Sequence, residues 1–143
     1  MSKKLLLLVV LLFVSVPAFA QSVDTAWIRT YNGPANEDDG AYAIAVDASG
    51  NVYVTGYSWS YGTWEDYLTI KYYPNGDTAW VRRYNGPENR LDRAYSIAVD
   101  DSGNVYVTGF SGGVWPENAY SDYATIKYFS FSVGTLIRME ILV

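Results

Sequence analysis

The chain has 143 residues and a formal net charge of -5, with 15 acidic and 10 basic side chains. This acidic balance argues against binding to nucleic acid, which rewards basic patches through counterion release, and against binding to anionic lipid headgroups. The chain contains no cysteine and no histidine, which excludes disulfides, Ser-His-Asp and Cys-His catalysis, and histidine-ligated zinc.

Residues 1–20 have the pattern of a secretory signal peptide. Lys3 and Lys4 form a positive region, Leu5–Val16 is an apolar run, and small residues ending at Ala20 form a cleavage site. A membrane anchor is the alternative, but the apolar run is shorter than the ~20 residues that span a bilayer. We therefore expect a secreted, periplasmic or cell-surface protein with no membrane span after cleavage.

The sequence after the signal repeats itself. Asp24–Gly56 and Asp77–Gly109 are identical at 25 of 33 aligned positions, with a shift of 53 residues. A repeat of this length sets the architecture before any single motif is interpreted. It divides residues 21–130 into two units, of about residues 24–76 and 77–130.

Each unit consists of short β-prone runs separated by turn residues. In the first unit the predicted strands are Tyr42–Asp47, Val52–Tyr57, Asp66–Tyr73 and Thr78–Tyr84. In the second unit they are Tyr95–Asp100, Val105–Phe110 and Asp122–Phe129. The segment Asp24–Tyr31 is a lone copy of the fourth strand, placed before the first unit.

A four-stranded sheet that recurs every ~40–50 residues is typical of a β-propeller blade. The sequence therefore predicts an all-β fold of two four-stranded antiparallel blade units. Blades stack face to face, which explains why Ala43 and Ala45 alternate with Ile44 and Val46 rather than with charged residues. Because propellers have ~4–8 blades, we expect an incomplete propeller or one that oligomerisation completes.

The motifs DxSGNVYVTGYS, DYxTIKY and TAWVRRYNGP closely resemble the bacterial β-propeller repeat often called the SBBP repeat. The resemblance covers nearly all of Asp24–Tyr128. It implies an exported or surface-associated protein built of blades, commonly seven of them. It implies no catalytic residue, because the family shares none.

Residues 131–143 depart from the repeat. Leu136 and Arg138 fall where Trp80 and Arg82 lie in the first unit, so one interpretation is a degenerate fourth strand. The other interpretation is a truncated or frame-shifted product, in other words a fragment of a longer propeller without independent function.

Aromatic residues gather between the second and third strands of each unit. They are Trp59, Tyr61, Trp64, Trp115 and Tyr120. We favour the interpretation that these rings pack between neighbouring loops and blades. The alternative is a carbohydrate site, because long loops on a rigid scaffold often bind ligands and flat rings beside carboxylates suit sugars.

No cofactor is expected, and calcium is the alternative. Glu37–Asp39 lacks the ligand spacing of a calcium loop, so a solvated loop is favoured. Asp47–Asn51 and Asp100–Asn104 place oxygens two residues apart, but Asp and Asn are also what a tight hairpin requires. No spacing singles out a pair of catalytic carboxylates, and an enzyme is not supported.

The predicted function is that of an exported, non-catalytic repeat module for binding, display or assembly. Its expected partners are copies of itself or other propeller repeats, because two blades alone leave apolar faces uncovered. A carbohydrate-binding or carbohydrate-active protein that uses the aromatic loops, with a glycan partner, is the alternative.

Overall fold

The computed structural model describes residues 22–113 and 121–130, which form strands and turns. The strands are β1 (Asp39–Val46), β2 (Val52–Ser60), β3 (Trp64–Tyr72), β4 (Thr78–Tyr84), β5 (Leu91–Val99), β6 (Val105–Gly113) and β7 (Asp122–Tyr128). The predicted signal peptide lies outside the described residues. No helix in the described part of the chain is long and apolar enough to cross a membrane.

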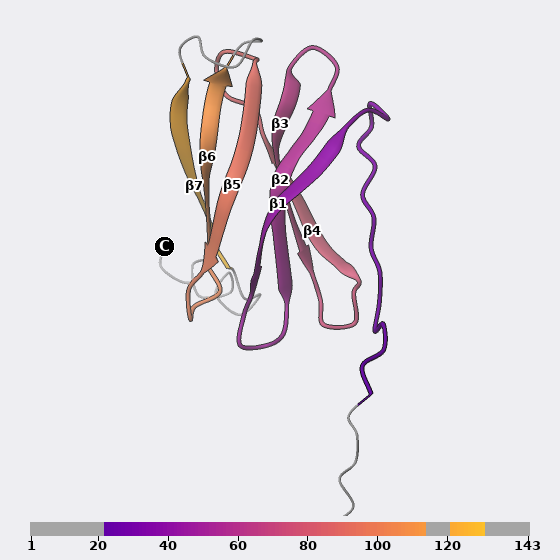
Figure 1. Cartoon of the computed structure of the whole chain (residues 1–143). Coiled ribbons are helices and arrows are strands. Elements are labelled where there is room, and N and C mark those ends of the chain that lie inside the picture. The colour runs from indigo at the N-terminus through magenta and orange to yellow at the C-terminus, as the bar shows by residue number, and fades with distance from the viewer. Residues whose placement is uncertain (1–21, 114–120, 131–143) are drawn as a thin grey trace, which may run out of the picture.

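The strands form two antiparallel sheets that stand side by side (Figure 1). The first sheet has the order β1-β2-β3-β4 and the second has the order β5-β6-β7. This confirms the predicted all-β blade fold. The predicted fourth strand of the second unit would fall in residues 131–143, outside the described residues.

Strand alternation places two different sets of side chains on the two faces of each sheet. On the face of the first sheet that is turned toward the second, Tyr53 lies beside Lys71 and Thr55 beside Thr69. The opposite face carries Val54 beside Ile70. We call the two faces that meet the inner faces, and the other two the outer faces.

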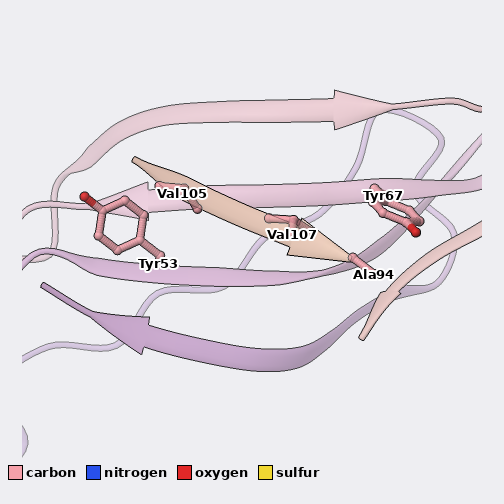
Figure 2. Close-up of a cluster of buried hydrophobic side chains, with 5 residues drawn as sticks. All are labelled: Tyr53, Tyr67, Ala94, Val105 and Val107. Atoms are coloured by element: carbon pink, nitrogen blue, oxygen red, sulfur yellow. The ribbon is translucent and has the colours of Figure 1, made fainter. Parts of the chain in front are cut away.

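The core lies between the two inner faces. Its buried members come from both sheets (Figure 2), and they are Tyr53, Tyr67, Ala94, Val105 and Val107. β5 packs against β1, β2 and β3, and the Tyr67 hydroxyl donates a hydrogen bond to the Ala124 carbonyl at 3.2 Å. Burial of these large apolar side chains is the main force that holds the sheets together.

The connection between β2 and β3 is shorter than the long loop predicted over residues 58–65. Strand pairing continues to Ser60 and Trp64, which face each other. Positive φ angles of 87° at Gly62 and 67° at Trp64 allow the chain to reverse within this tight turn. The prediction of a long loop was wrong here, because the polar and aromatic residues at its two ends pair as strand residues.

The segment Asp24–Tyr31, predicted as a lone fourth strand, belongs to neither sheet. It runs along the first sheet on the side away from the second sheet (Figure 1). The Trp27 indole Nε1 donates to the Pro74 carbonyl at 3.1 Å, and Arg29 Nε donates to the Gly76 carbonyl at 2.7 Å. Side-chain hydrogen bonds, and not strand pairing, therefore hold this segment against the first sheet.

Candidate functional site

The most distinctive surfaces of the molecule are the two outer faces, because each one repeats an inner face. The outer face of the first sheet carries the repeat counterparts of the residues on the inner face of the second sheet. We call this set the first outer face, and its members are Ile44, Val46, Val52, Val54, Leu68, Ile70 and Tyr72. Their counterparts on the second sheet are Ile97, Val99, Val105, Val107, Ala124, Ile126 and Tyr128, which form or border the buried core.

The same repeat position has a different exposure on the two sheets. On the second sheet, Ile97 and Val99 are half-buried and pack against the core, at the repeat positions that Ile44 and Val46 hold on the first sheet. On the first outer face, Ile44 is 66% exposed and Val46 is 61% exposed. The first outer face is thus an apolar surface that corresponds to a packed face of the second sheet. It is exposed to solvent at its β1 side.

The outer face of the second sheet repeats the inner face of the first. We call this set the second outer face, and its members are Tyr106, Thr108, Tyr123, Thr125 and Lys127, the counterparts of Tyr53, Thr55, Tyr67, Thr69 and Lys71. Tyr67 is 0% exposed, whereas Tyr123 is 84% exposed.

Side chains on the second outer face already have the arrangement that they have on the buried face. Thr55 Oγ1 lies 2.9 Å from Thr69 Oγ1 in the core, and Thr108 Oγ1 lies 2.9 Å from Thr125 Oγ1 at the surface. The Lys127 ammonium lies 5.0 Å from the centre of the Tyr106 ring, a contact that also orients this lysine. This surface is therefore preformed for the contact that its counterpart makes.

The N-terminal segment lies on the first sheet as β4 lies on the second. The rings of Trp27 and Tyr72 are 5.8 Å apart, and those of their counterparts Trp80 and Tyr128 are 5.7 Å apart. Between this segment and the first outer face is an apolar groove of about 260 Å³, which Trp27 and Tyr72 help to line. The segment thus occupies the place of a fourth strand from a preceding sheet.

Comparison with known families agrees with this repeated geometry. The family model described as SBBP, beta-propeller repeat, matches residues 27–62 and again residues 79–113. The chain belongs to the SBBP beta-propeller repeat family. No curated protein matches the chain significantly. The two sheets are accordingly SBBP blades, and the first and second sheets are called the first and second blades below.

One contact between the two SBBP blades has no counterpart on the outer faces. The Arg93 guanidinium pairs with the Glu65 carboxylate, with Nη2 donating to Oε1 at 3.0 Å. The counterparts of these residues are Gly40 and Ser121, neither of which carries a charge. The blade interface within the chain therefore has an ion pair that an interface through the outer faces would lack.

The structure describes three of the five rings of the predicted aromatic site. Trp59 and Tyr61 meet edge to face, with ring centres 5.4 Å apart, and the Tyr61 hydroxyl donates to the Ala35 carbonyl at 3.2 Å. Trp64 is 54% exposed at the start of β3. Trp115 and Tyr120 lie outside the described residues, so the prediction of ligand contacts for this group stays a prediction.

The two Asp-x-Ser-Gly-Asn segments form hydrogen-bonded hairpin turns. The Asp47 carboxylate accepts hydrogen bonds from the backbone N–H groups of Ser49 and Asn51, the Asn51 side chain and the Tyr53 hydroxyl. Burial opposes ionisation of Asp47, but these hydrogen bonds outweigh it and lower its pKa. This arrangement is the one that a tight turn between strands requires.

The second turn repeats the first. Asp100 accepts from Ser102, Asn104 and Tyr106 in the same pattern. Its pKa is lowered chiefly by the hydrogen bond from the Asn104 side chain. The two carboxylates therefore hold the hairpin turns in their ionised forms.

Sequence reasoning missed two aspartates at equivalent repeat positions, the half-buried Asp39 and the buried Asp92. Asp39 was assigned to a solvated loop, but it begins β1 and accepts the Gly33 N–H at 2.7 Å. Its counterpart Asp92 is 0% exposed and accepts the N–H groups of Gly86 and Gly112. In the described residues no group of three or more acidic side chains is placed to hold a metal ion.

The signal for these aspartates was present in the sequence. The pairs Gly33 with Asp39 and Gly86 with Asp92 repeat at the same spacing. A Cβ atom at Gly33 would lie 2.5 Å from Ser58 Oγ, closer than atoms can approach, so the turn requires glycine. These groups join the connection before each blade to its first strand, and their role is structural.

Proposed function

We propose that the chain is an exported, non-catalytic SBBP module that functions by assembly, with other copies of the same chain as its first partners. The observation that carries this proposal is the exposure of the second outer face and of the β1 side of the first, whose repeat counterparts form the interface between the two blades. Ile44 and Tyr123, one from each outer face, are 66% and 84% exposed.

The chemistry of the two faces favours a head-to-tail contact between copies. The first outer face is aliphatic except for Tyr72, whereas the second is made of tyrosine, threonine and lysine. The two outer faces are complementary to each other in the same way as the two inner faces. A contact between two first outer faces, or between two second outer faces, would not have this complementarity. Such a heterologous contact forms a ring if its rotation closes and a filament if it does not.

The contact would draw on the same forces as the buried core. Exposed apolar patches of several hundred Å² are uncommon on monomers and typically mark interaction sites. Tyr123 and Trp27 offer large rings, the residue types that dominate interface energies. Closed rings of this chain would contain even numbers of blades, because each copy contributes two.

Export is part of the proposal and rests on residues 1–20, whose charged start, apolar run and small residues before Ala20 have the features of a secretory signal. Fractionation of the natural host, with detection of a product that begins at Gln21, would test it. Recovery of the uncleaved chain in the cytoplasm would overturn export.

Assembly is tested by multi-angle light scattering over a hundredfold range of protein concentration. The proposal predicts a mass that rises with concentration toward whole multiples of the chain mass. A monomer mass throughout the range would overturn it. Addition of a panel of polysaccharides provides the second arm: a mass that changes only with glycan would favour the carbohydrate-binding alternative.

A further inference from the structure

We propose that Asp24–Tyr31 of one copy is the fourth strand of the second blade of another copy, added along the edge of β7 that faces away from β6. This inference rests on the proposed self-association and specifies the segment and the edge that carry it. It is an addition of an extended strand to a sheet edge, a recognised mode of protein association.

The first argument is the sequence of the segment. Asp24–Tyr31 reads DTAWIRTY, and Asp77–Tyr84, which contains β4, reads DTAWVRRY. Because β4 pairs with β3 from Tyr67 to Tyr72, a segment with nearly the same residues has the side chains needed to pair along β7. The β7 sequence DYATIKY likewise matches DYLTIKY of β3.

The second argument is the location of the segment. The ring contact of Trp27 with Tyr72 reproduces that of Trp80 with Tyr128. Asp24–Tyr31 therefore already lies on its own first blade where the fourth strand of a preceding blade would lie. It does not need to leave this place to pair with β7 of a second copy docked beside it.

The third argument is the outer edge of the second blade. In the described residues β7 pairs only with β6, whereas its counterpart β3 lies between β2 and β4. An open strand edge presents unpaired backbone N–H and C=O groups, which is a template for another strand. Tyr123 and Phe129, at the two ends of this edge, are 84% and 63% exposed.

The pairing of β3 with β4 fixes the register of the proposed contact. Tyr67 faces Tyr84, Leu68 faces Arg83, and Ile70 faces Val81. Transfer of these pairs by the repeat gives Tyr123 opposite Tyr31, Ala124 opposite Thr30, and Ile126 opposite Ile28. The same docking places the second outer face of one copy on the first outer face of the next, so strand pairing and face packing occur together.

The absence of cysteine from the sequence makes disulfide trapping a direct test. Thr30→Cys and Ala124→Cys are made in separate full-length chains, mixed in equal amounts and oxidised. Their side chains would lie on the same face of the joined sheet, opposite each other. The matched control is Thr30→Cys mixed with Thr125→Cys, because a shift of one residue turns the side chain to the other face.

The proposal predicts a disulfide-linked dimer of Thr30→Cys with Ala124→Cys, at least tenfold more abundant than in the control mixture. Equal yields, or no heterodimer, would overturn strand donation. If light scattering still shows association in that case, another segment fills the β7 edge, such as residues 131–143, and the proposed function stands. A monomer mass at every concentration, without a disulfide-linked dimer, would overturn both.

Discussion

Tyr67 and Tyr123 occupy the same position of two SBBP repeats, yet Tyr67 is fully buried between the blades and Tyr123 is 84% exposed. Tyr67 is covered by the second blade and by Tyr84 of the adjoining β4, whereas Tyr123 has neither neighbour in the described residues. This pair therefore offers a matched comparison of a side chain with and without its blade partner.

Substitution of the two tyrosines by alanine should affect different properties of the protein. Tyr67→Ala should lower the free energy of unfolding by about 3–5 kcal/mol, because it removes a large buried ring. Tyr123→Ala should change it by less than ~0.5 kcal/mol in the monomer and should weaken self-association. Urea unfolding at low concentration measures the first effect and light scattering the second. Similar losses of stability in the two variants would contradict this account.

The ion pair of Arg93 with Glu65 should stabilise the contact between blades within one chain. Both side chains are largely buried, at 17% and 13% exposure. Arg93→Ala should lower the unfolding free energy by about 1–3 kcal/mol, because it leaves a desolvated carboxylate without its partner. The control is Arg90→Ala, whose partner Glu88 is 65% exposed and whose loss should cost about 0.5 kcal/mol or less. Equal effects of both changes would rule out a special role for Arg93.

The hairpin aspartates should make stability depend on acid pH. The folded-state pKa of Asp47 and that of Asp100 are both lowered below 3.8, the ordinary value of an aspartate side chain. Their ionised forms therefore stabilise the fold above that value, and the contribution disappears as pH falls through the lower folded-state pKa.

The corresponding experiment compares urea midpoints at pH 7 and pH 3. The wild type should lose stability between them, and the double variant Asp47→Asn with Asp100→Asn should start lower at pH 7 and lose less. An unchanged pH dependence in the double variant would show that these turns are not the source of the acid sensitivity.

The exposed aromatic rings at the turn between β2 and β3 allow a test of the carbohydrate alternative without damage to the core. Tyr61 and Trp64 are 75% and 54% exposed, so the double variant Tyr61→Ala with Trp64→Ala should fold normally. The assembly account predicts that retention on a panel of immobilised polysaccharides is the same for this variant and the wild type. A selective loss of retention, with the unfolding midpoint unchanged, would favour glycan binding.

The course of the chain could largely be predicted from the sequence. The fourth strand of the first blade was predicted as Thr78–Tyr84, as found, because turn residues mark both of its ends. The turn at Asp47–Asn51 was identified from its Asp, Gly and Asn residues, whose conformational preferences are local. The same turn recurs at Asp100–Asn104, between runs of the same β-prone residues.

Features that depend on two distant segments could not be predicted in this way. Nothing near Arg93 in the sequence indicates Glu65 as its partner, because the contact joins two blades. Asp39 was taken for a solvated residue because it follows Glu37 and Asp38, although its partner is the Gly33 backbone. Uncovered apolar faces were predicted from the two-blade length, but not that Ile44 lies on one of them, since its pattern is that of a buried strand and only the neighbouring blade decides its burial.

The most direct test of the central claim, that the two outer faces bind each other head to tail, is a mixing experiment. Ile44→Glu blocks the first outer face and Tyr123→Glu blocks the second, each at an exposed position. Light scattering should show monomers for either variant alone. An equal mixture should form a dimer and nothing larger, because one intact face of each kind remains. A mixture that stays monomeric, at concentrations where the wild type associates, would contradict the account.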